Sequence, residues 1–213
     1  VIFGLANGMN IICEKPLCLN EEDLKEIKMV EAKTGKKVYN IVQLRKHPAI
    51  AALKESYRGE KSEIELSFIA SRGAWYFKSW KMNEALSGGI PMNLGIHFFD
   101  MLFWIFGKPV QSNLLAKSAS TYRGEITLET GSAVKWVLSI DKSEIPAKKL
   151  EEGKTTFRSI KIDGKEFDIS DGGTDLHLEV YKTIFEGKGA EFEIPQIESA
   201  LRFTSELLKE PNR

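Results

Sequence analysis

The 213-residue sequence has few of the features that mark specialised protein classes. Its two cysteines, Cys13 and Cys18, are too few for a disulfide framework and lack the neighbouring ligands of a zinc site. We therefore expect reduced thiols, a cytoplasmic protein and no metal. Thirty basic and thirty acidic residues cancel, so no overall field attracts nucleic acid or an anionic membrane. The longest apolar run, residues 98–106, is interrupted by Asp100 and is shorter than the ~20 residues of a membrane span, so we expect no membrane partner either.

The chain also lacks an initiator Met and a signal peptide, since no basic segment precedes an apolar one at its start. Residues 1–8 have the pattern of the last turns of a helix, which Asn7-Gly8 would end because glycine tolerates the left-handed C-cap conformation. A chain that opens inside a helix is expected to be a fragment of a longer protein.

The first 45 residues alternate helix and strand. Asn20 is a good N-cap for three acidic residues at the positive end of a helix, and Gly35 is a good stop. Such α/β alternation predicts parallel strands. The expected elements are a helix ending near residue 7, strands over 9–13 and 38–44, and a helix over 21–34.

From residue 46 the pattern changes to a run of strands followed by helices, which predicts an α+β layer with one sheet and helices on one face. Asp163-Gly164 predicts a tight hairpin between strands over 157–162 and 165–169, and Thr130-Gly131 predicts a turn. We expect two domains, 1–45 and 46–213. The expected elements of the second are helices over 48–58, 92–106, 174–187 and 195–209, strands over 62–71 and within 110–170, a long loop over 72–89, and a charged surface loop over 142–154.

One predicted helix, 92–106, carries a polar stripe on an otherwise apolar sequence. Asn93, His97 and Asp100 fall at i, i+4 and i+7, which places them on one side at about 100° per residue. They could form a satisfied structural network, since buried polar groups must be hydrogen-bonded. They could instead line a site, with His97 as proton carrier because imidazole titrates near neutrality. A metal site from His97 and Asp100 would lack further ligands.

Glu14-Lys15-Pro16 follows the first predicted strand, at the edge where open α/β sheets bind their ligands. An ammonium there could orient a hydroxyl or carbonyl and stabilise developing negative charge. The alternative is an ordinary surface turn.

Cations and aromatics alternate over residues 72–81. Cations pair with phosphates, and aromatic faces stack on planar rings or sugars, so a nucleotide-linked ligand would suit the segment. The alternatives are a lid or a dimer contact. The segment's cationic and aromatic residues are Arg72, Trp75, Tyr76, Lys78, Trp80 and Lys81.

Outside this segment, His47 is expected to be structural and His177 is expected to be an exposed helix histidine.

Two motifs together resemble the Gfo/Idh/MocA oxidoreductase family. Glu14-Lys15-Pro16 is similar to its first signature, and the run from Gly88-Gly89 through Asn93 and His97 to Asp100 is similar to its second. The resemblance covers nearly the whole chain. It implies the tail of a Rossmann domain followed by a C-terminal α/β domain with an open, mostly antiparallel sheet, through which subunits associate as a homo-oligomer. It also implies NAD or NADP as cofactor and hydride transfer at a sugar or cyclitol carbon.

Shorter motifs resemble the family's sugar-nucleotide dehydrogenases of surface-polysaccharide synthesis, which oxidise the 3-hydroxyl of UDP-N-acetylglucosaminuronic acid. These motifs are residues 43–48, 72–76, 79–81 and 175–177. The implied catalytic residues are Lys15 and His97, of which His97 is favoured as base and a lysine of lowered pKa is the alternative. The implied substrate-binding residues are Asn93, Lys81, Arg72, Tyr76 and Asp100, and the implied cofactor-binding residues are Glu14 and Lys15.

One departure from the family pattern limits this expectation. No G-x-G-x-x-G turn for a dinucleotide pyrophosphate is present, so the chain alone is expected to bind the cofactor poorly and to be inactive. Two alternatives stay open: a non-catalytic dimerisation or substrate-binding module, and a family dehydrogenase acting on an inositol or a free sugar.

Overall fold

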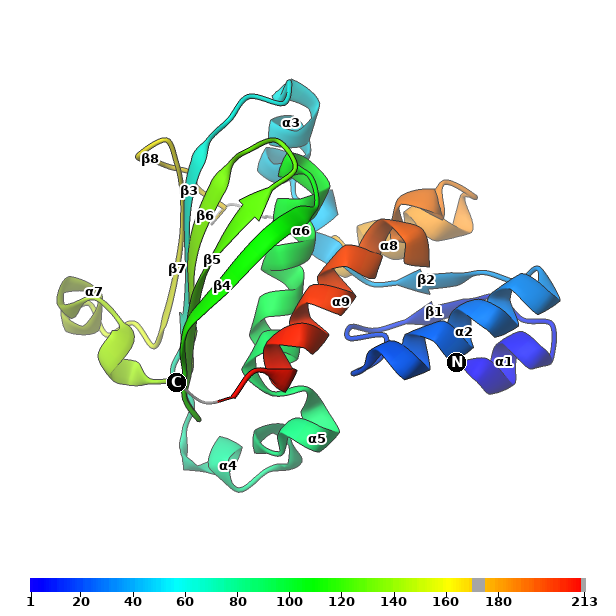
Figure 1. Ribbon diagram of the computed structural model, residues 1–213, viewed down its shortest axis with the longest axis horizontal. Coiled ribbons are helices and arrows are strands. Elements are labelled where there is room, and N and C mark those ends of the chain that lie inside the picture. Colours follow the sequence, from blue (N-terminus) through cyan, green and yellow to red (C-terminus); the bar gives the residue numbers. More distant parts are fainter. Residues whose placement is uncertain (170–174, 212–213) are drawn as a thin grey trace.

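The computed structural model describes residues 1–169 and 175–211. It contains a two-stranded sheet and a six-stranded sheet with the order β4-β5-β6-β3-β7-β8 (Figure 1). In chain order the elements are α1 (Ile2–Ala6), β1 (Ile11–Cys13), α2 (Glu21–Thr34), β2 (Val38–Asn40), α3 (Pro48–Ser56), β3 (Glu63–Ala70), α4 (Ala74–Phe77), α5 (Glu84–Ser87), α6 (Ile96–Phe106), β4 (Pro109–Lys117), β5 (Thr121–Leu128), β6 (Ala133–Ser139), α7 (Ala147–Glu151), β7 (Thr156–Ile162), β8 (Lys165–Glu166), α8 (Leu176–Phe185) and α9 (Ile194–Lys209).

The N-terminal unit has the predicted α/β character. Strands β1 and β2 pair in parallel, and the Asn20 side chain accepts the Asp23 N–H at 2.8 Å to cap α2. Gly35 ends that helix with a φ of +67°, a conformation that favours glycine. Strand β2 is shorter than predicted, because a 3₁₀ turn over residues 43–46 carries Arg45 into the interior.

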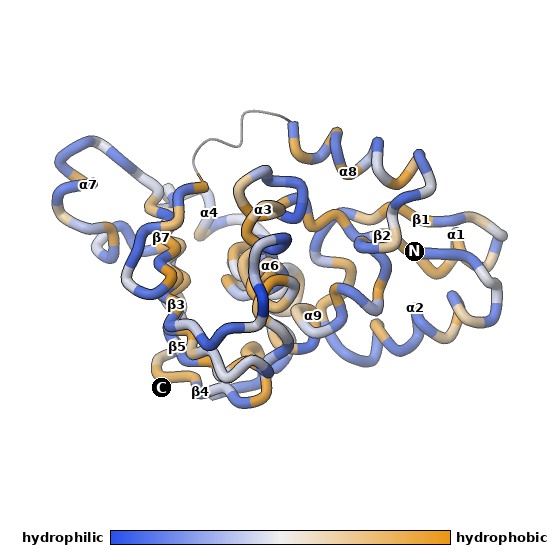
Figure 2. The backbone as a smooth tube through the Cα atoms, turned by 90° about the horizontal axis from the view of Figure 1, so that it is seen from above, coloured by the Kyte–Doolittle hydropathy of each residue, from blue (hydrophilic) through white to orange (hydrophobic). Residues whose placement is uncertain are grey.

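The large sheet is mixed and mostly antiparallel, as expected. Strand β3 runs parallel to β6 and antiparallel to β7, and the other neighbours are antiparallel. Alternation along the strands gives the sheet one apolar face, which α6 and α9 cover (Figures 1 and 2). The α/β fold class with helices on one face is therefore confirmed. The central strands direct Ile64, Leu66, Phe68, Val134, Trp136 and Leu138 to this face.

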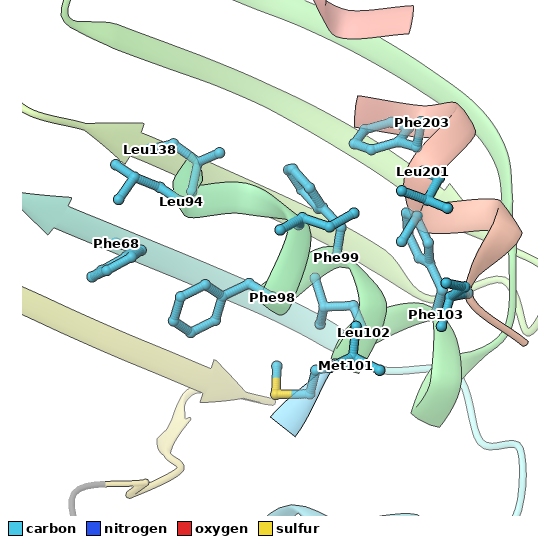
Figure 3. Packing of buried hydrophobic residues seen from close by; sticks show 14 of the residues in the cluster. Phe68, Leu94, Phe98, Phe99, Met101, Leu102, Phe103, Leu138, Leu201 and Phe203 are labelled. Carbon is cyan, nitrogen blue, oxygen red and sulfur yellow. The ribbon is translucent and has the colours of Figure 1, made fainter. Parts of the chain in front are cut away.

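Aromatic contacts hold α6 at the centre of the core. The Phe99 ring lies 5.2 Å from that of Trp136 on β6 and 4.7 Å from that of Phe203 on α9 (Figure 3 shows Phe99 and Phe203). The helical run Glu84–Phe106 is long and apolar enough to cross a membrane, by length and composition alone. Of its most apolar window, 83% is buried inside this fold, so these side chains form the core.

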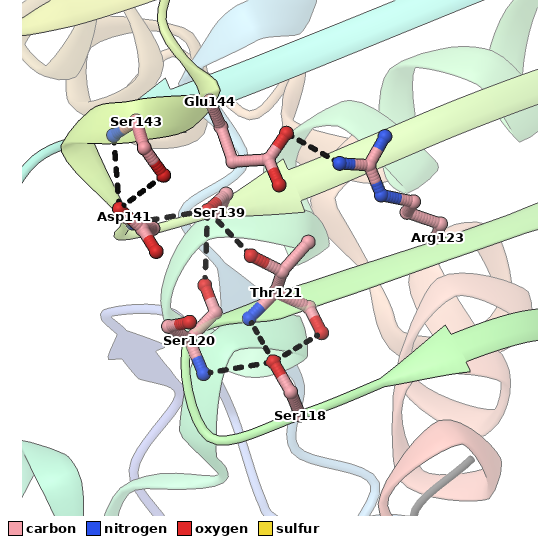
Figure 4. Close-up of polar contacts among 8 residues, drawn as sticks. All are labelled: Ser118, Ser120, Thr121, Arg123, Ser139, Asp141, Ser143 and Glu144. Atoms are coloured by element: carbon pink, nitrogen blue, oxygen red, sulfur yellow. Dashed lines mark hydrogen bonds and ion pairs between the residues drawn. The ribbon is translucent and has the colours of Figure 1, made fainter.

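Three expectations about local structure were wrong. The loop expected over 72–89 contains α4, a 3₁₀ turn and α5, and the one over 142–154 contains a 3₁₀ turn and α7. Asp141 caps the latter turn by accepting the Ser143 N–H, and an Arg123–Glu144 ion pair ties the turn to β5 (Figure 4). Strand β8 ends at Glu166 rather than 169. The predicted helix start at 174 lies outside the described residues.

Candidate functional site

Lys15 follows β1 and reaches the start of the core helix. Its amine donates to the backbone oxygen of Asn93 at 2.8 Å, which joins segments 78 residues apart. Burial lowers the pKa of Lys15; the positive charges of Lys81 and Arg72 act in the same direction, and Glu14 opposes them. The amine is therefore a partly desolvated cation among other cations, which an incoming anion or a developing alkoxide would stabilise.

His97 lies on the first turn of α6 and is half-buried. Its Nδ1 is buried without a hydrogen-bond partner. Burial lowers the pKa of His97 to about 3, and the positive charges of Lys15, His177 and Arg158 contribute to the shift. The imidazole is therefore neutral at pH 7 and has the unshared electron pair that a proton acceptor requires.

Asn93 lies on a π-helical turn over Pro91–Gly95 that precedes α6. Its side-chain amide donates to the backbone oxygen of Gly89 at 2.8 Å, while its own backbone oxygen receives Lys15. Such single π turns inside helices are frequent at functional sites. The π-helical turn thus places the backbone oxygen of Asn93 in contact with the amine of Lys15, the catalytic candidate.

The cations of the 72–81 segment lie over aromatic rings. The guanidinium of Arg72 lies 5.6 Å from the ring centroid of Tyr76, and the amine of Lys81 lies 5.7 Å from that of Trp75. The Arg72 Nε is buried without a hydrogen-bond partner. Tyr76 is 3% exposed, so its ring supports Arg72 and offers little surface to a ligand.

A cavity of about 800 Å³ opens between the N-terminal unit and the segment that carries α5. Its lining residues include Lys15, Lys81, Asn93, Trp80 and Cys18. Burial raises the pKa of Cys18 to about 12, so this thiol is protonated and unreactive at pH 7. The cavity thus combines two lysines and apolar side chains with one carboxylate, that of Asp23, and its lysines suit an anionic ligand with a planar ring.

Asp100 is not part of this cleft. Its carboxylate accepts from Arg45 Nη2 at 2.6 Å and from Nε at 2.9 Å, and both side chains are almost fully buried. His97 and Asp100 are about 60° apart around an α-helix, so the two side chains point to different neighbours. Of the two alternatives that the sequence left open, the satisfied structural network applies to Asp100. Its partner is Arg45, from the turn over residues 43–46.

Other sequence-predicted residues do not line the cavity. Glu14 is exposed, with its carboxylate 3.7 Å from His177 Nε2. His177 has an exposed side chain, as predicted. His47 is 4% exposed and contacts the Ile169 backbone oxygen at 3.2 Å, in agreement with its structural assignment.

The sequence reasoning did not select Arg158, which lies near His97. A signal for it exists: in β7, alternation places Arg158 on the same side as Ile160 and Ile162, and a charge at an apolar register position is unusual. Among the residues that the structure describes, no three His, Cys, Asp or Glu side chains are grouped to hold a metal ion.

Comparison with known proteins assigns this fold and site to a class. The model of the oxidoreductase family C-terminal alpha/beta domain, GFO_IDH_MocA_C, matches residues 59–193. The chain belongs to the Gfo/Idh/MocA oxidoreductase family.

Particular relatives extend the likeness. The crystal structure of the WlbA (WbpB) dehydrogenase from Thermus thermophilus in complex with NAD and UDP-GlcNAcA is 42% identical, with a TM-score of 0.90 over 99% of this chain and 67% of that one. The Bordetella pertussis WlbA dehydrogenase, in complex with NADH and UDP-GlcNAcA, has a TM-score of 0.79 over 96% of this chain and 70% of that one; at 16% identity it shows the fold alone. YteT of Bacillus subtilis is 27% identical over 130 residues, which are 58% of this chain and 30% of YteT.

Proposed function

We propose that this chain is the substrate-binding part of an NAD(P)-dependent dehydrogenase that oxidises the 3-hydroxyl of UDP-N-acetylglucosaminuronic acid. The observation that carries the proposal is the contact between Lys15 and the Asn93 turn, beside a neutral His97 and a cationic cavity. The 42% identity to a protein crystallised with NAD and UDP-GlcNAcA supports the choice of substrate.

The chain's own residues would act on the substrate side of the reaction. His97 would accept the hydroxyl proton, because its imidazole is neutral at pH 7. Lys15 would donate a hydrogen bond to the same oxygen and stabilise the alkoxide that forms. Asn93 would fix Lys15 in position through its backbone oxygen.

The residues present fit only part of a dinucleotide site. Glu14 and Lys15 lie at the carboxyl end of β1, the edge at which a nicotinamide would approach, yet the sequence has no glycine-rich turn to hold a pyrophosphate. The chemistry that the cofactor supplies when bound is acceptance of hydride. We therefore derive from this chain only substrate binding and proton transfer.

A calorimetric titration of the chain with UDP-N-acetylglucosaminuronic acid tests the proposal, with glucuronic acid and NAD as separate controls. We expect saturable binding of the UDP-sugar alone. The Arg72→Ala, Lys81→Ala double variant should bind at least about 10-fold more weakly, since hydrogen bonds to charged groups contribute ~1.5–3 kcal/mol. A matched double variant, Arg123→Ala with Lys161→Ala, removes two cations elsewhere and should bind normally. Absence of UDP-sugar binding, or equal binding by both double variants, would refute the proposal.

The outer face of the large sheet favours an additional role in association. Within the described residues no helix covers this face over β4, β5 and β6, and α7 overhangs only the part near β3 and β7 (Figure 2). Leu115 on β4 is 53% exposed, and the face is otherwise mixed in polarity. We propose a homo-oligomer formed through this face, and sedimentation at several concentrations tests it.

A further inference from the structure

Arg158 occupies an unusual place in the sheet. The register pairs it with Phe68, so its side chain lies on the face that packs against the helices. The other residues of β3, β6 and β7 on that face carry no charge. A charged side chain there needs either a partner or access to a solvent-filled cleft.

The position of the guanidinium follows from two ring contacts. Its carbon lies 5.0 Å from the centroid of the Phe68 ring, which in turn lies 4.9 Å from the ring of Phe98 (Figure 3 shows both rings). Phe98 directly follows His97 at the start of α6. Two ring contacts thus separate Arg158 from the residue that follows His97, and its charge contributes to the lowered pKa of His97.

No carboxylate among residues 1–169 and 175–211 forms an ion pair with Arg158. Arg45, Arg123 and Arg202 each form an ion pair with a carboxylate, whereas Arg158 forms none within 4.0 Å among the described residues. Arg158 is exposed and also borders a groove along β7, so solvent and ligands reach it. A guanidinium that is held against an aromatic ring, and that has no carboxylate partner among the described residues, is suited to bind a carboxylate in bidentate fashion.

Resting on the function proposed above, we propose that Arg158 binds the carboxylate of the substrate's sugar ring, while Arg72 and Lys81 bind its diphosphate. The diphosphate and the ring carboxylate are attached at different carbons of one sugar, so they require two separate cationic groups. Lys81 lines the large cavity, whereas Arg158 lies in the sheet, over the Phe68 ring. Arg158 would thus determine specificity for a uronic acid over a neutral sugar.

Two ligands that differ only at the carboxylate test this assignment. The 213-residue chain is titrated calorimetrically with UDP-N-acetylglucosaminuronic acid and with UDP-N-acetylglucosamine, in which a hydroxymethyl group replaces the carboxylate. The wild-type chain should prefer the acid. Arg158→Gln should weaken binding of the acid by about 10- to 150-fold and leave binding of the neutral sugar within about threefold. Arg158→Lys, which keeps the charge but loses the fork, should fall between them.

Arg123→Gln is the matched control. It removes another half-exposed arginine, on β5 of the same sheet, and should bind both ligands as the wild type does. Equal effects of Arg158→Gln on both ligands, or no effect on either, would overturn the assignment while leaving the proposed function intact. Binding of neither ligand by the wild-type chain would refute the proposed function and this inference with it.

Discussion

The buried ion pair between Arg45 and Asp100 gives the most direct test of the structure. Asp100→Asn would leave the guanidinium buried without a counter-charge, with one amide oxygen and the backbone oxygens of Glu191 and Gln196 as acceptors. Removing one partner of a buried pair costs about 3–5 kcal/mol, since the remaining charge is uncompensated. For a chain of this size that corresponds to a melting temperature lower by roughly 6–20 °C.

Thermal and urea unfolding followed by circular dichroism would measure the loss. Glu65→Gln is the control: its ion pair with Lys161 spans 3.4 Å between side chains that are 62% and 43% exposed, so its loss should cost less than about 1 kcal/mol. At a temperature where Asp100→Asn is folded, its affinity for UDP-N-acetylglucosaminuronic acid should equal that of the wild type. Near wild-type stability combined with lost ligand binding would refute the structural role and favour the substrate role implied by the resemblance.

Three further predictions concern stability. His97 has a pKa of about 3 in the folded state and ~6.5 in the unfolded state, so at acidic pH the unfolded state binds the extra proton. The free energy of unfolding of the wild type should therefore fall by up to about 3 kcal/mol between pH 6.5 and 4. His97→Gln should show a smaller fall in urea unfolding over that range, and an equally large one would contradict the assignment. The pKa of Lys15 in the folded state lies below its ordinary value of 10.5, so its buried charge destabilises the fold at neutral pH, and this effect is lost as the pH rises toward 10.5. Lys15→Met should therefore have a higher melting temperature than the wild type at pH 7, by a difference that shrinks toward pH 10. A difference that stays constant with pH would contradict this. Gly95→Ala would place a Cβ 2.7 Å from side-chain carbons of Leu138 and Phe99, and its predicted cost of about 1–3 kcal/mol can be measured by urea unfolding, where an unchanged midpoint would show that the core relaxes freely.

The domain division at residue 45 stays a prediction. Arg45, at the end of the first unit, pairs with α6 of the second, and Lys15 contacts the turn before that helix. These contacts pack the two units against each other. The change of sequence pattern at residue 45 therefore marks a change in topology, and it does not imply that the two units fold independently.

The sequence by itself determined the elements whose signals are local. Asn20 and Gly35 define the ends of α2, and Asp163-Gly164 forms the predicted hairpin with φ values of +50° and +76°. Capping and turn chemistry act within a few residues, so they can be read without knowledge of the fold. The family signatures likewise name Lys15 and His97 as catalytic candidates, and that role stays a prediction.

Only the tertiary structure decided which polar residues meet. Asn93, His97 and Asp100 form one stripe in sequence, but Asp100 turns to Arg45 and the Asn93 turn receives Lys15. Neither family motif contains Arg158, and its position over Phe68 follows from the strand pairing. Periodicity states which side of an element a residue occupies; the element packed against that side, which comes from distant sequence, decides whether the residue is structural or faces a ligand.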